Sequence, residues 1–116
     1  MAEVTTLYGI ANCDTIKKAR AWLANREIEF QFHDYRKQGL DIELLNAWVD
    51  ELGWEALVNR RGTTWRQLAA EVRDSLDTKS AIEIMLDKPA IIKRPLLVKN
   101  GQSYLGFSDE QYSSIF

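Results

Sequence analysis

The fold is decided by residues 4–33, VTTLYGIANCDTIKKARAWLANREIEFQFH. Residues 4–8 are rich in β-branched and aromatic side chains and stop at Gly9, which predicts a strand. Residues 28–33 alternate apolar and polar side chains with a period of two, which predicts a second strand. Both flank a stretch with helical spacing, and strand–helix–strand within about 30 residues is the size of a βαβ unit. The two strands should therefore be parallel and joined by a right-handed crossover.

The helix between these strands has one apolar face and one basic face. We expect it to begin after Cys13 and to end near Asn25 or Arg26, with Asn25 as a candidate C-cap. Its apolar face consists of Ile16, Ala19, Trp22 and Leu23.

The middle of the chain predicts further helices. Gly39 and Asp41 precede a helical pattern that Gly53 ends, with apolar side chains at Ile42, Leu45, Trp48, Val49 and Leu52. A shorter segment at residues 54–58 and a polar turn at residues 59–64 follow. Residues 65–73 and 80–86 predict two more helices, with apolar stripes formed by Leu68 and Val72 and by Ile82, Met85 and Leu86. Because neither flank has a linker composition, we interpret residues from about 40 to 87 as a helical insertion within one domain spanning residues 1–116.

The last third of the chain returns to strands. Residues 96–99 and 103–105 predict two strands joined by Asn100-Gly101, the dipeptide favoured in two-residue hairpin turns. Ser108 is a good N-cap for a terminal helix, and the acids that follow it suit the positive end of the helix dipole. The order β-α-β, helices, β-hairpin, α predicts an α/β fold with a thioredoxin-like mixed sheet and a helical insertion.

Composition excludes several classes of protein. The chain has 116 residues, of which 46% are hydrophobic and 28% charged, so it can build a core and is neither disordered nor fibrous. Its net charge of −2, with both signs interspersed, gives no global attraction to nucleic acid or to a membrane surface. Apolar runs are shorter than the roughly 20 residues that span a bilayer, and the first residues lack the basic character of a signal peptide. We therefore expect a cytoplasmic monomer.

A single cysteine and a single histidine limit the chemistry further. One cysteine cannot form an internal disulfide, and this pair of residues cannot supply the ligands of a zinc site. We expect no metal and no bound cofactor. His33 has no cysteine, histidine or acid cluster around it in the sequence and is interpreted as structural, and the four Trp occupy helical core positions.

Cys13 is the main candidate for chemistry. It lies between a predicted strand end and a predicted helix start, where unpaired N–H groups and the helix dipole favour an anion. Such a position can lower the pKa of a thiol and so make it a nucleophile. Lys17 lies four residues on and adds positive charge on the same helix face, whereas Asp14 opposes it. The alternative is a buried structural cysteine, but the carboxyl edge of the sheet favours a functional one.

Arginines form the second group of candidates. Arg94-Pro95 directly precedes a predicted strand, so Pro95 is a candidate cis residue. In a thioredoxin-like arrangement this turn lies beside the first loop, which would bring Arg94 toward Cys13 as a ligand for an oxyanion or a carboxylate. Arg60 and Arg61 in the polar turn are a third basic element, which alone reads as an ordinary solvated pair.

Three segments together resemble the arsenate-reductase-like family, which also contains the Spx regulators, and most of all its YffB-type bacterial branch. They are residues 8–19 (YGIANCDTIKKA), residues 61–65 (RGTTW) and residues 92–98 (IKRPLLV), in the same order as in that branch. The resemblance covers essentially the whole chain and implies a thioredoxin fold with a helical insertion.

The resemblance also implies roles for individual residues. Cys13 matches the family's nucleophile, Arg94 an oxyanion-binding arginine, and Arg61 a second arginine, for which Arg60 is the alternative. The substrate-binding positions that it implies are Asn12, Thr15, Lys17, Arg60 and Pro95.

The chain departs from its relatives at three places. Arsenate reductases of this family commonly have a histidine where this chain has Gly9, and a third arginine where it has Gly106-Phe107. Spx regulators commonly have a C-x-x-C pair, but the residue three positions after Cys13 is Ile16. These departures argue against arsenate reduction and against a disulfide switch.

We therefore predict a monothiol oxidoreductase, a thiol/disulfide reductase that uses Cys13 as nucleophile with Arg61 and Arg94. Without a second cysteine, an external thiol must release the adduct, so glutathione or another small thiol is the expected co-substrate and partner. The alternatives are an Spx-like module that binds a protein partner and, third, an arsenate reductase.

Overall fold

The computed structural model describes residues 5–116, which form two compact units. One unit consists of the described residues up to Gln38 together with Arg94–Phe116, and the other is Gly39–Lys93. The helical block is thus longer than the expected 40–87, because a 3-10 turn at Pro89–Ile91 and the residues after it belong to it. Val4, expected at the start of the first strand, lies outside the described residues.

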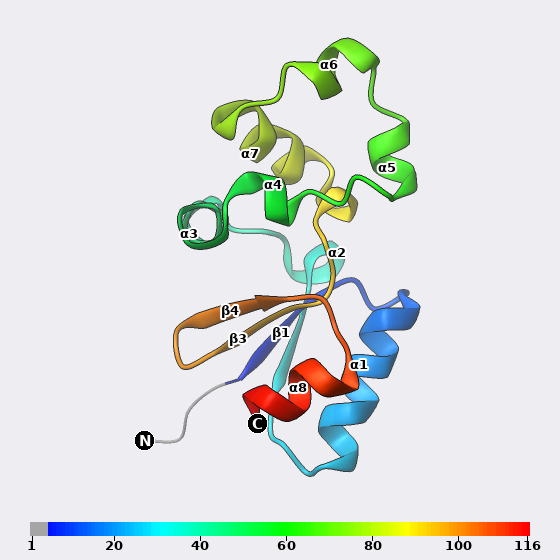
Figure 1. The fold of residues 1–116 in the computed structure, drawn as a ribbon, viewed down its shortest axis with the longest axis vertical. Helices are drawn as coiled ribbons and strands as arrows, with labels where there is room; N and C mark the ends of the chain where they lie inside the picture. The colour runs from blue at the N-terminus through cyan, green and yellow to red at the C-terminus, as the bar shows by residue number, and fades with distance from the viewer. Residues whose placement is uncertain (1–4) are drawn as a thin grey trace. The chain divides into compact units, whose positions relative to one another are not determined.

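The first unit is built on a sheet with strand order β2-β1-β3-β4. The strands are β1 (Thr6–Gly9), β2 (Gln31–Asp34), β3 (Leu96–Lys99) and β4 (Gln102–Leu105). As expected, β1 and β2 are parallel, and β3 and β4 form an antiparallel hairpin; β3 also runs antiparallel to β1. The turn between β3 and β4 consists of Asn100 and Gly101, whose φ values of 55° and 75° are the left-handed values that a two-residue hairpin turn needs. The mixed α/β sheet confirms the predicted thioredoxin-like class (Figure 1).

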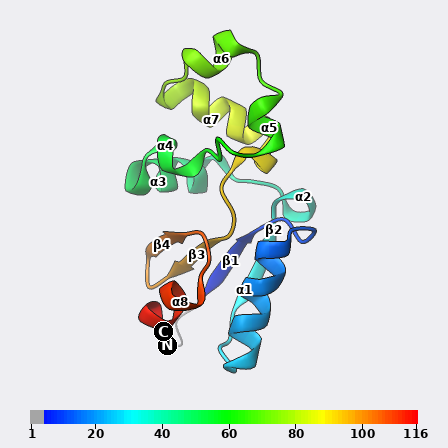
Figure 2. The same cartoon turned by 45° about the vertical axis from the view of Figure 1, so that its right-hand side comes forward.

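Two helices, α1 (Asp14–Asn25) and α8 (Asp109–Ile115), pack on this sheet through one buried cluster. Its members are Leu7, Ala19, Trp22, Leu23, Leu97 and Tyr112. Leu7 and Leu97 are register partners in β1 and β3, so they present one apolar surface to both helices. Each fully buried leucine contributes about 1.5–3 kcal/mol. Figure 2 shows α1 extending along β1 and β2.

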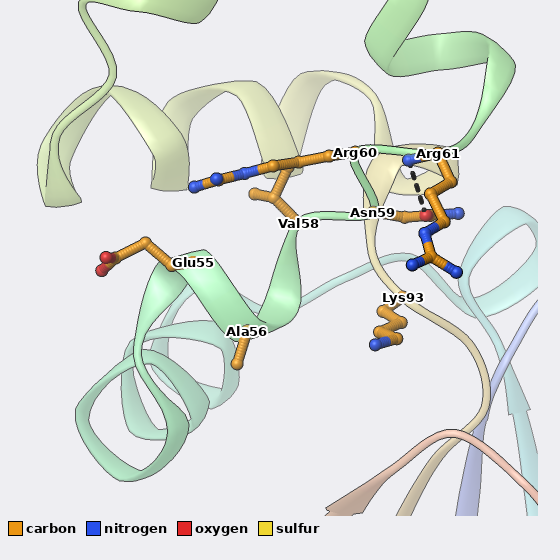
Figure 3. Close-up of a pocket in the computed structure, with 7 residues that line it drawn as sticks. All are labelled: Glu55, Ala56, Val58, Asn59, Arg60, Arg61 and Lys93. Atoms are coloured by element: carbon orange, nitrogen blue, oxygen red, sulfur yellow. Dashed lines mark hydrogen bonds between the residues drawn. The ribbon is translucent and has the colours of Figure 1, made fainter.

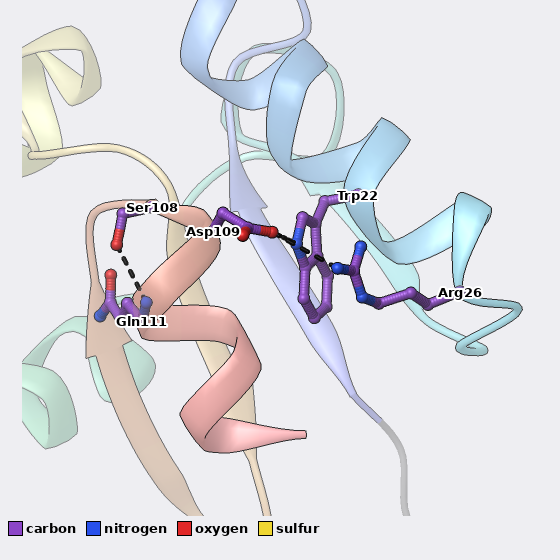
Figure 4. A network of polar contacts seen from close by, with 5 residues as sticks. All are labelled: Trp22, Arg26, Ser108, Asp109 and Gln111. Atoms are coloured by element: carbon purple, nitrogen blue, oxygen red, sulfur yellow. Dashed lines mark hydrogen bonds and ion pairs between the residues drawn. The ribbon is translucent and has the colours of Figure 1, made fainter.

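A polar network ties α1 to α8 (Figure 4). The carboxylate of Asp109 accepts a hydrogen bond from the Trp22 indole N–H and forms an ion pair with Arg26 at 3.4 Å. The Arg26 guanidinium lies 3.9 Å from the centre of the Trp22 ring. Ser108 caps α8 as expected, since its Oγ accepts the Gln111 N–H at 3.0 Å. The network fixes the start of α8 against the last turn of α1.

The second strand differs from the expectation. Residues 28–33 were expected, but β2 runs from Gln31 to Asp34, because the chain first has to turn after α1. Glu27 takes a left-handed φ of 55°, and the Ile28 N–H bonds the Leu23 carbonyl at 3.0 Å. Ile28 therefore closes the helix end and packs against the core cluster instead of pairing in the sheet. The helix ends at Asn25 as expected, but Arg26 is its C-cap.

The second unit consists of short helices. They are α3 (Ile42–Leu52), α4 (Trp54–Leu57), α5 (Thr63–Arg66), α6 (Ala70–Asp74), α7 (Thr78–Asp87) and the turn η1 (Pro89–Ile91), while α2 (Tyr35–Gln38) belongs to the first unit. Asp41 caps α3 by accepting the Glu43 N–H, and Gly53 ends α3 with a φ of 84°. Asp77 and Ser80 form a capping box at the start of α7. The buried core of this unit is Leu45, Trp48, Val49, Leu57, Val58, Ala81, Met85, Ile91 and Ile92.

The prediction of a single helix over residues 65–73 is wrong. Its residues divide between α5 and α6, because Ala69 has an extended backbone (φ −60°, ψ 144°) that interrupts the helical hydrogen bonds. The expected stripe of Leu68 and Val72 does not form a core face either, since Val72 is 38% exposed. Leu68 is only half-buried, so the periodic spacing of the two side chains overestimated their burial.

Candidate active site

Cys13 is the N-cap residue of α1, at the end of the loop that follows β1. Its extended backbone (φ −141°, ψ 128°) turns the chain into the helix, and its carbonyl accepts the Lys17 N–H at 3.0 Å. The side chain is half-buried. The thiol thus lies at the helix end whose first N–H groups have no intrahelical partners, a position that stabilises negative charge.

The surroundings of the sulfur favour the thiolate. Burial works to raise the pKa of the Cys13 thiol, but the Ile16 N–H, the Arg94 side chain and the Thr15 N–H outweigh it. The pKa of Cys13 therefore lies below its ordinary value. Among the described residues, the neutral thiol makes no side-chain hydrogen bond that caps the helix. The N–H groups of Ile16 and Thr15 therefore stabilise mainly the charged form of the sulfur.

Arg94 is the second member of the site. It is half-buried, it directly precedes β3, and its side chain hydrogen-bonds the sulfur of Cys13, to which it also adds a positive charge. The pairing of β3 with β1 produces this approach, because Tyr8 near the end of β1 is the register partner of Leu96. A guanidinium at this place can stabilise a thiolate and bind an anionic substrate group with its remaining N–H groups.

The Arg94-Pro95 peptide bond is cis, as the sequence suggested. Pro95 is buried, and its carbonyl accepts the Gly106 N–H at 2.9 Å. Gly106-Phe107, where the resemblance implies a third arginine in arsenate reductases, has packing and backbone contacts in this structure. The Phe107 ring packs edge-on against Tyr112 with centroids 4.7 Å apart.

The other residues expected near the thiol are on the same loop and helix turn. Asn12 is exposed, Thr15 is half-buried and offers its N–H to the sulfur, and Lys17 is exposed on α1. The groups that lower the pKa of Cys13 are Arg94 and the two helical N–H groups, whereas the charge of Lys17 is not among them. Lys17 contributes through its backbone, which bonds the Cys13 carbonyl.

Sequence reasoning missed Asp34, which fixes the loop in front of Cys13. Its buried carboxylate accepts the Ala11 N–H at 3.3 Å and the Arg36 N–H at 2.8 Å, which joins the loop to the start of α2. Burial works to raise the pKa of Asp34, but the backbone N–H groups around it outweigh burial, so its pKa lies below the ordinary value. A signal was available: an acid at the end of a predicted strand, next to the strand that leads to the cysteine.

His33 is part of an aromatic group in the first unit, which agrees with its interpretation as structural. Its ring centroid lies 5.1 Å from that of Tyr8 and 6.1 Å from that of Tyr35. Tyr35 is buried, and burial raises the pKa of its hydroxyl, as the nearby Tyr8 does to a lesser degree, while Arg94 opposes both.

Arg60 and Arg61 belong to the second unit, where they line a cleft of about 320 Å³ together with Lys93 (Figure 3). The other lining residues are Glu55, Ala56, Val58 and Asn59. The Asn59 Oδ1 accepts the Arg61 N–H at 3.1 Å and so fixes the turn that carries both arginines. Among the described residues, none of the three cations of the cleft is in an ion pair. The cleft therefore has an excess of positive charge.

The structure distinguishes the two arginines. The Arg60 guanidinium lies over the rings of Trp54 and Trp65, at 5.6 and 5.8 Å from their centres, within the range of cation–π attraction. In Figure 3 its side chain extends away from Arg61, which lies on the same side as Asn59 and Lys93. Of the two, Arg61 is the one whose guanidinium has no aromatic ring beneath it among residues 5–116. Lys93 is a cleft residue that sequence reasoning missed.

Residues 5–116 contain no group of three or more His, Cys, Asp or Glu side chains arranged to hold a metal ion. None of the helices in this part of the chain has both the length and the apolar composition that a membrane crossing requires.

The chain is similar to known proteins over nearly its whole length. The model of the ArsC family matches residues 8–115. The chain is 30% identical over 108 residues to the "Global transcriptional regulator Spx" of Streptococcus agalactiae, covering 91% of this chain and 78% of that protein.

Two solved structures are more similar. A protein described as YFFB superposes with a TM-score of 0.89 at 44% identity, covering 95% of this chain and 96% of the other. An arsenate reductase (ArsC) related protein from Brucella melitensis superposes with a TM-score of 0.83 at 46% identity, covering 98% and 95% of the two chains.

Proposed function

Because the chain belongs to the ArsC family and has the fold of arsenate-reductase-like thiol oxidoreductases, we propose that it is a glutathione-dependent reductase that works with one cysteine. The observation that carries the proposal is the setting of Cys13. The only cysteine of the chain occupies the N-cap position of α1, its sulfur is hydrogen-bonded by Arg94, and its pKa is lowered. These are the properties of a nucleophilic thiolate.

In the first step the Cys13 thiolate attacks the glutathione sulfur of a mixed disulfide. A Cys13–glutathione disulfide forms as the substrate's own sulfur–sulfur bond breaks, and the substrate leaves as a thiolate that takes a proton from water. The positive charge of Arg94 stabilises the attacking thiolate in the resting protein and the charge shared among the three sulfurs in the transition state.

In the second step the thiolate of a free glutathione attacks the glutathione sulfur of this adduct. Glutathione disulfide forms, and Cys13 leaves as the thiolate from which the cycle began. Over both steps one free glutathione is consumed, the substrate thiol is released, and the glutathione of the mixed disulfide ends with the free one in glutathione disulfide. Ile16 occupies the position of a resolving cysteine and is fully buried, which supports the choice of an external thiol.

The cations of the cleft in the second unit are suited to bind the carboxylate groups of a ligand. Glutathione carries two carboxylates, and the Arg61 guanidinium and the Lys93 ammonium are cations without ion-pair partners among the described residues. We propose that Arg61 contributes to glutathione affinity, with Lys93 as a second cation. Arg60, held over two indole rings, contributes less.

Steady-state turnover of a glutathione mixed disulfide tests the proposal. We expect Cys13→Ser to lose activity entirely, and the wild-type protein incubated with the mixed disulfide alone to gain the mass of one glutathionyl group. Arg61→Ala should raise KM for glutathione about 3- to 10-fold, the loss of one charged hydrogen bond at an exposed site. Lys79→Ala, which removes an exposed cation of the same unit outside the cleft, is the matched control. Unchanged turnover in Cys13→Ser would refute the proposal.

A protein-binding role is the second candidate, favoured by the similarity to the regulator named Spx. In that case turnover is negligible, and a pull-down recovers the same stable partner with wild-type protein and with Cys13→Ser. Arsenate is tested in the same assay as a third candidate. Arsenate-dependent oxidation of glutathione that disappears in Arg94→Ala supports it, and no such oxidation removes it.

A further inference from the structure

Gly9 ends β1 directly in front of the loop that carries Cys13. It is buried, and its backbone has no left-handed φ, so its conformation does not require a glycine. The reason for a glycine here must therefore lie in the space around the position.

That space is occupied by Ile16. A Cβ atom at position 9 would lie 2.3 Å from Cδ1 of Ile16 and 3.0 Å from its Cγ1, and 3.9 Å from Cγ of Arg94. Carbon atoms in contact are normally about 3.5–4.0 Å apart, so the contact with Arg94 is ordinary and both contacts with Ile16 are not. Ile16 is completely buried, and a shift of its side chain would meet other core atoms.

Ile16 is also the residue whose N–H favours the thiolate most. It stands in the first turn of α1, and its backbone N–H has the largest effect of the groups that stabilise the Cys13 sulfur as an anion. A side chain at position 9 would push on Ile16 from the sheet, and the first turn of α1 is the part of the helix that would move.

We propose that Gly9 is a positioning residue for Cys13: the space left by its missing side chain seats Ile16 against β1, and Ile16 in turn holds its own N–H beside the sulfur. Gly9 acts through Ile16 and touches neither the thiol nor a substrate. The inference deepens the proposed function, since it names a residue that prepares the nucleophile, and it rests on that function only for the role of Cys13.

The test uses three variants and the pH dependence of alkylation of the single cysteine. Gly9→Ala introduces the clash, Ile16→Val deletes Cδ1, the atom at 2.3 Å, and the double variant combines them. We expect Gly9→Ala to raise the pKa of Cys13 and to slow alkylation at pH 6 by about 3- to 10-fold, the effect of a weakened hydrogen bond to a charged group. At a pH where the thiol is fully ionised, Gly9→Ala and wild type should be alkylated at the same rate.

The double variant separates positioning from general damage. We expect the double variant to return most of the way from Gly9→Ala toward wild type, because only the 3.0 Å contact with Cγ1 remains. Ile16→Val alone measures what the loss of Cδ1 itself does to the pKa of Cys13. The same titration curve for Gly9→Ala and wild type, with both folded by circular dichroism, overturns the proposal, as does a double variant no closer to wild type than Gly9→Ala.

Should Gly9→Ala fail to fold alone, the comparison passes to the double variant against Ile16→Val. The remaining contact still predicts a raised pKa of Cys13 in the double variant, and identical curves overturn the proposal. Alkylation needs no turnover, so a protein without glutathione-dependent activity would refute the proposed function and leave this test intact.

Discussion

Removal of the Asp34 carboxylate is expected to destabilise the protein and loosen the loop before Cys13. In Asp34→Ala the N–H groups of Ala11 and Arg36 lose a charged acceptor, at 3.3 and 2.8 Å respectively. A hydrogen bond to a charged group contributes about 1.5–3 kcal/mol, and the longer bond contributes less than the shorter one. We therefore expect a loss of about 2–4 kcal/mol in the free energy of unfolding, a large part of the stability of a small domain.

The dependence on pH identifies the charged form of Asp34 as the cause. Because the pKa of Asp34 is lowered in the folded protein, its contribution is complete above the ordinary pKa of 3.8 and is lost as pH falls through the lower folded value. The difference in unfolding free energy between wild type and Asp34→Ala should thus be constant from pH 5 to 8 and decrease below that window. Asp34→Asn, which keeps the shape without the charge, should lie between the two.

Denaturant unfolding followed by fluorescence of the four Trp measures these free energies. Alkylation of Cys13 in native conditions measures the loop, and we expect its rate at neutral pH to change in Asp34→Ala. Asp14→Ala, which removes an exposed acid on the other side of Cys13, is the control for charge alone. A loss below about 0.5 kcal/mol, typical of surface substitutions, or a difference that persists undiminished at acid pH, would refute this account of Asp34.

Three further substitutions test other parts of the structure. Arg94→Ala should raise the pKa of Cys13, seen as a shift of its alkylation profile to higher pH, and Arg94→Lys should raise it less because the charge remains; unchanged profiles contradict the assignment. Trp22→Phe removes the indole N–H that Asp109 accepts, and thermal unfolding should show a loss of about 1–3 kcal/mol; a neutral result would mean that this bond adds nothing. Met85→Ala, at a fully buried site of the second unit, should cost about 2–5 kcal/mol in denaturant unfolding, with Glu83→Ala on the exposed face as a neutral control.

Much of the secondary structure follows from short-range signals in the sequence. Asp41, Asp77 and Ser108 cap helices because a side-chain oxygen reaches an N–H two or three residues away. Asn100-Gly101 forms the hairpin turn because both residues accept a left-handed φ. The errors have a different origin. The start of β2 shifts because Glu27 takes a left-handed φ and the Ile28 N–H bonds the Leu23 carbonyl, and α5 and α6 separate at the extended backbone of Ala69; the periodicity of side chains reports neither backbone conformation.

The candidate site divides in the same way. Cys13 could be found from its place between a strand and a helix, since a helix start presents N–H groups whatever the rest of the fold does. Arg94 could be proposed only together with a fold, because its approach to Cys13 depends on β3 pairing with β1. Asp34 could have been suspected from its place at a strand end, but its bond to Ala11, 23 residues away along the chain, and the place of Lys93 in the cleft depend on the fold.

The sequence by itself determined the order of the strands and of the two helices that pack on their sheet, the position of the thiol at a helix start and the absence of a second cysteine, because these depend on neighbouring residues or on composition. Only the tertiary structure decided that Gly9 and Ile16 meet, that Arg94 reaches the sulfur, and that Arg61 rather than Arg60 is the arginine not engaged by indole rings. The physical reason is that close packing and charge act over a few ångströms in space, and chain folding alone brings distant residues within that range.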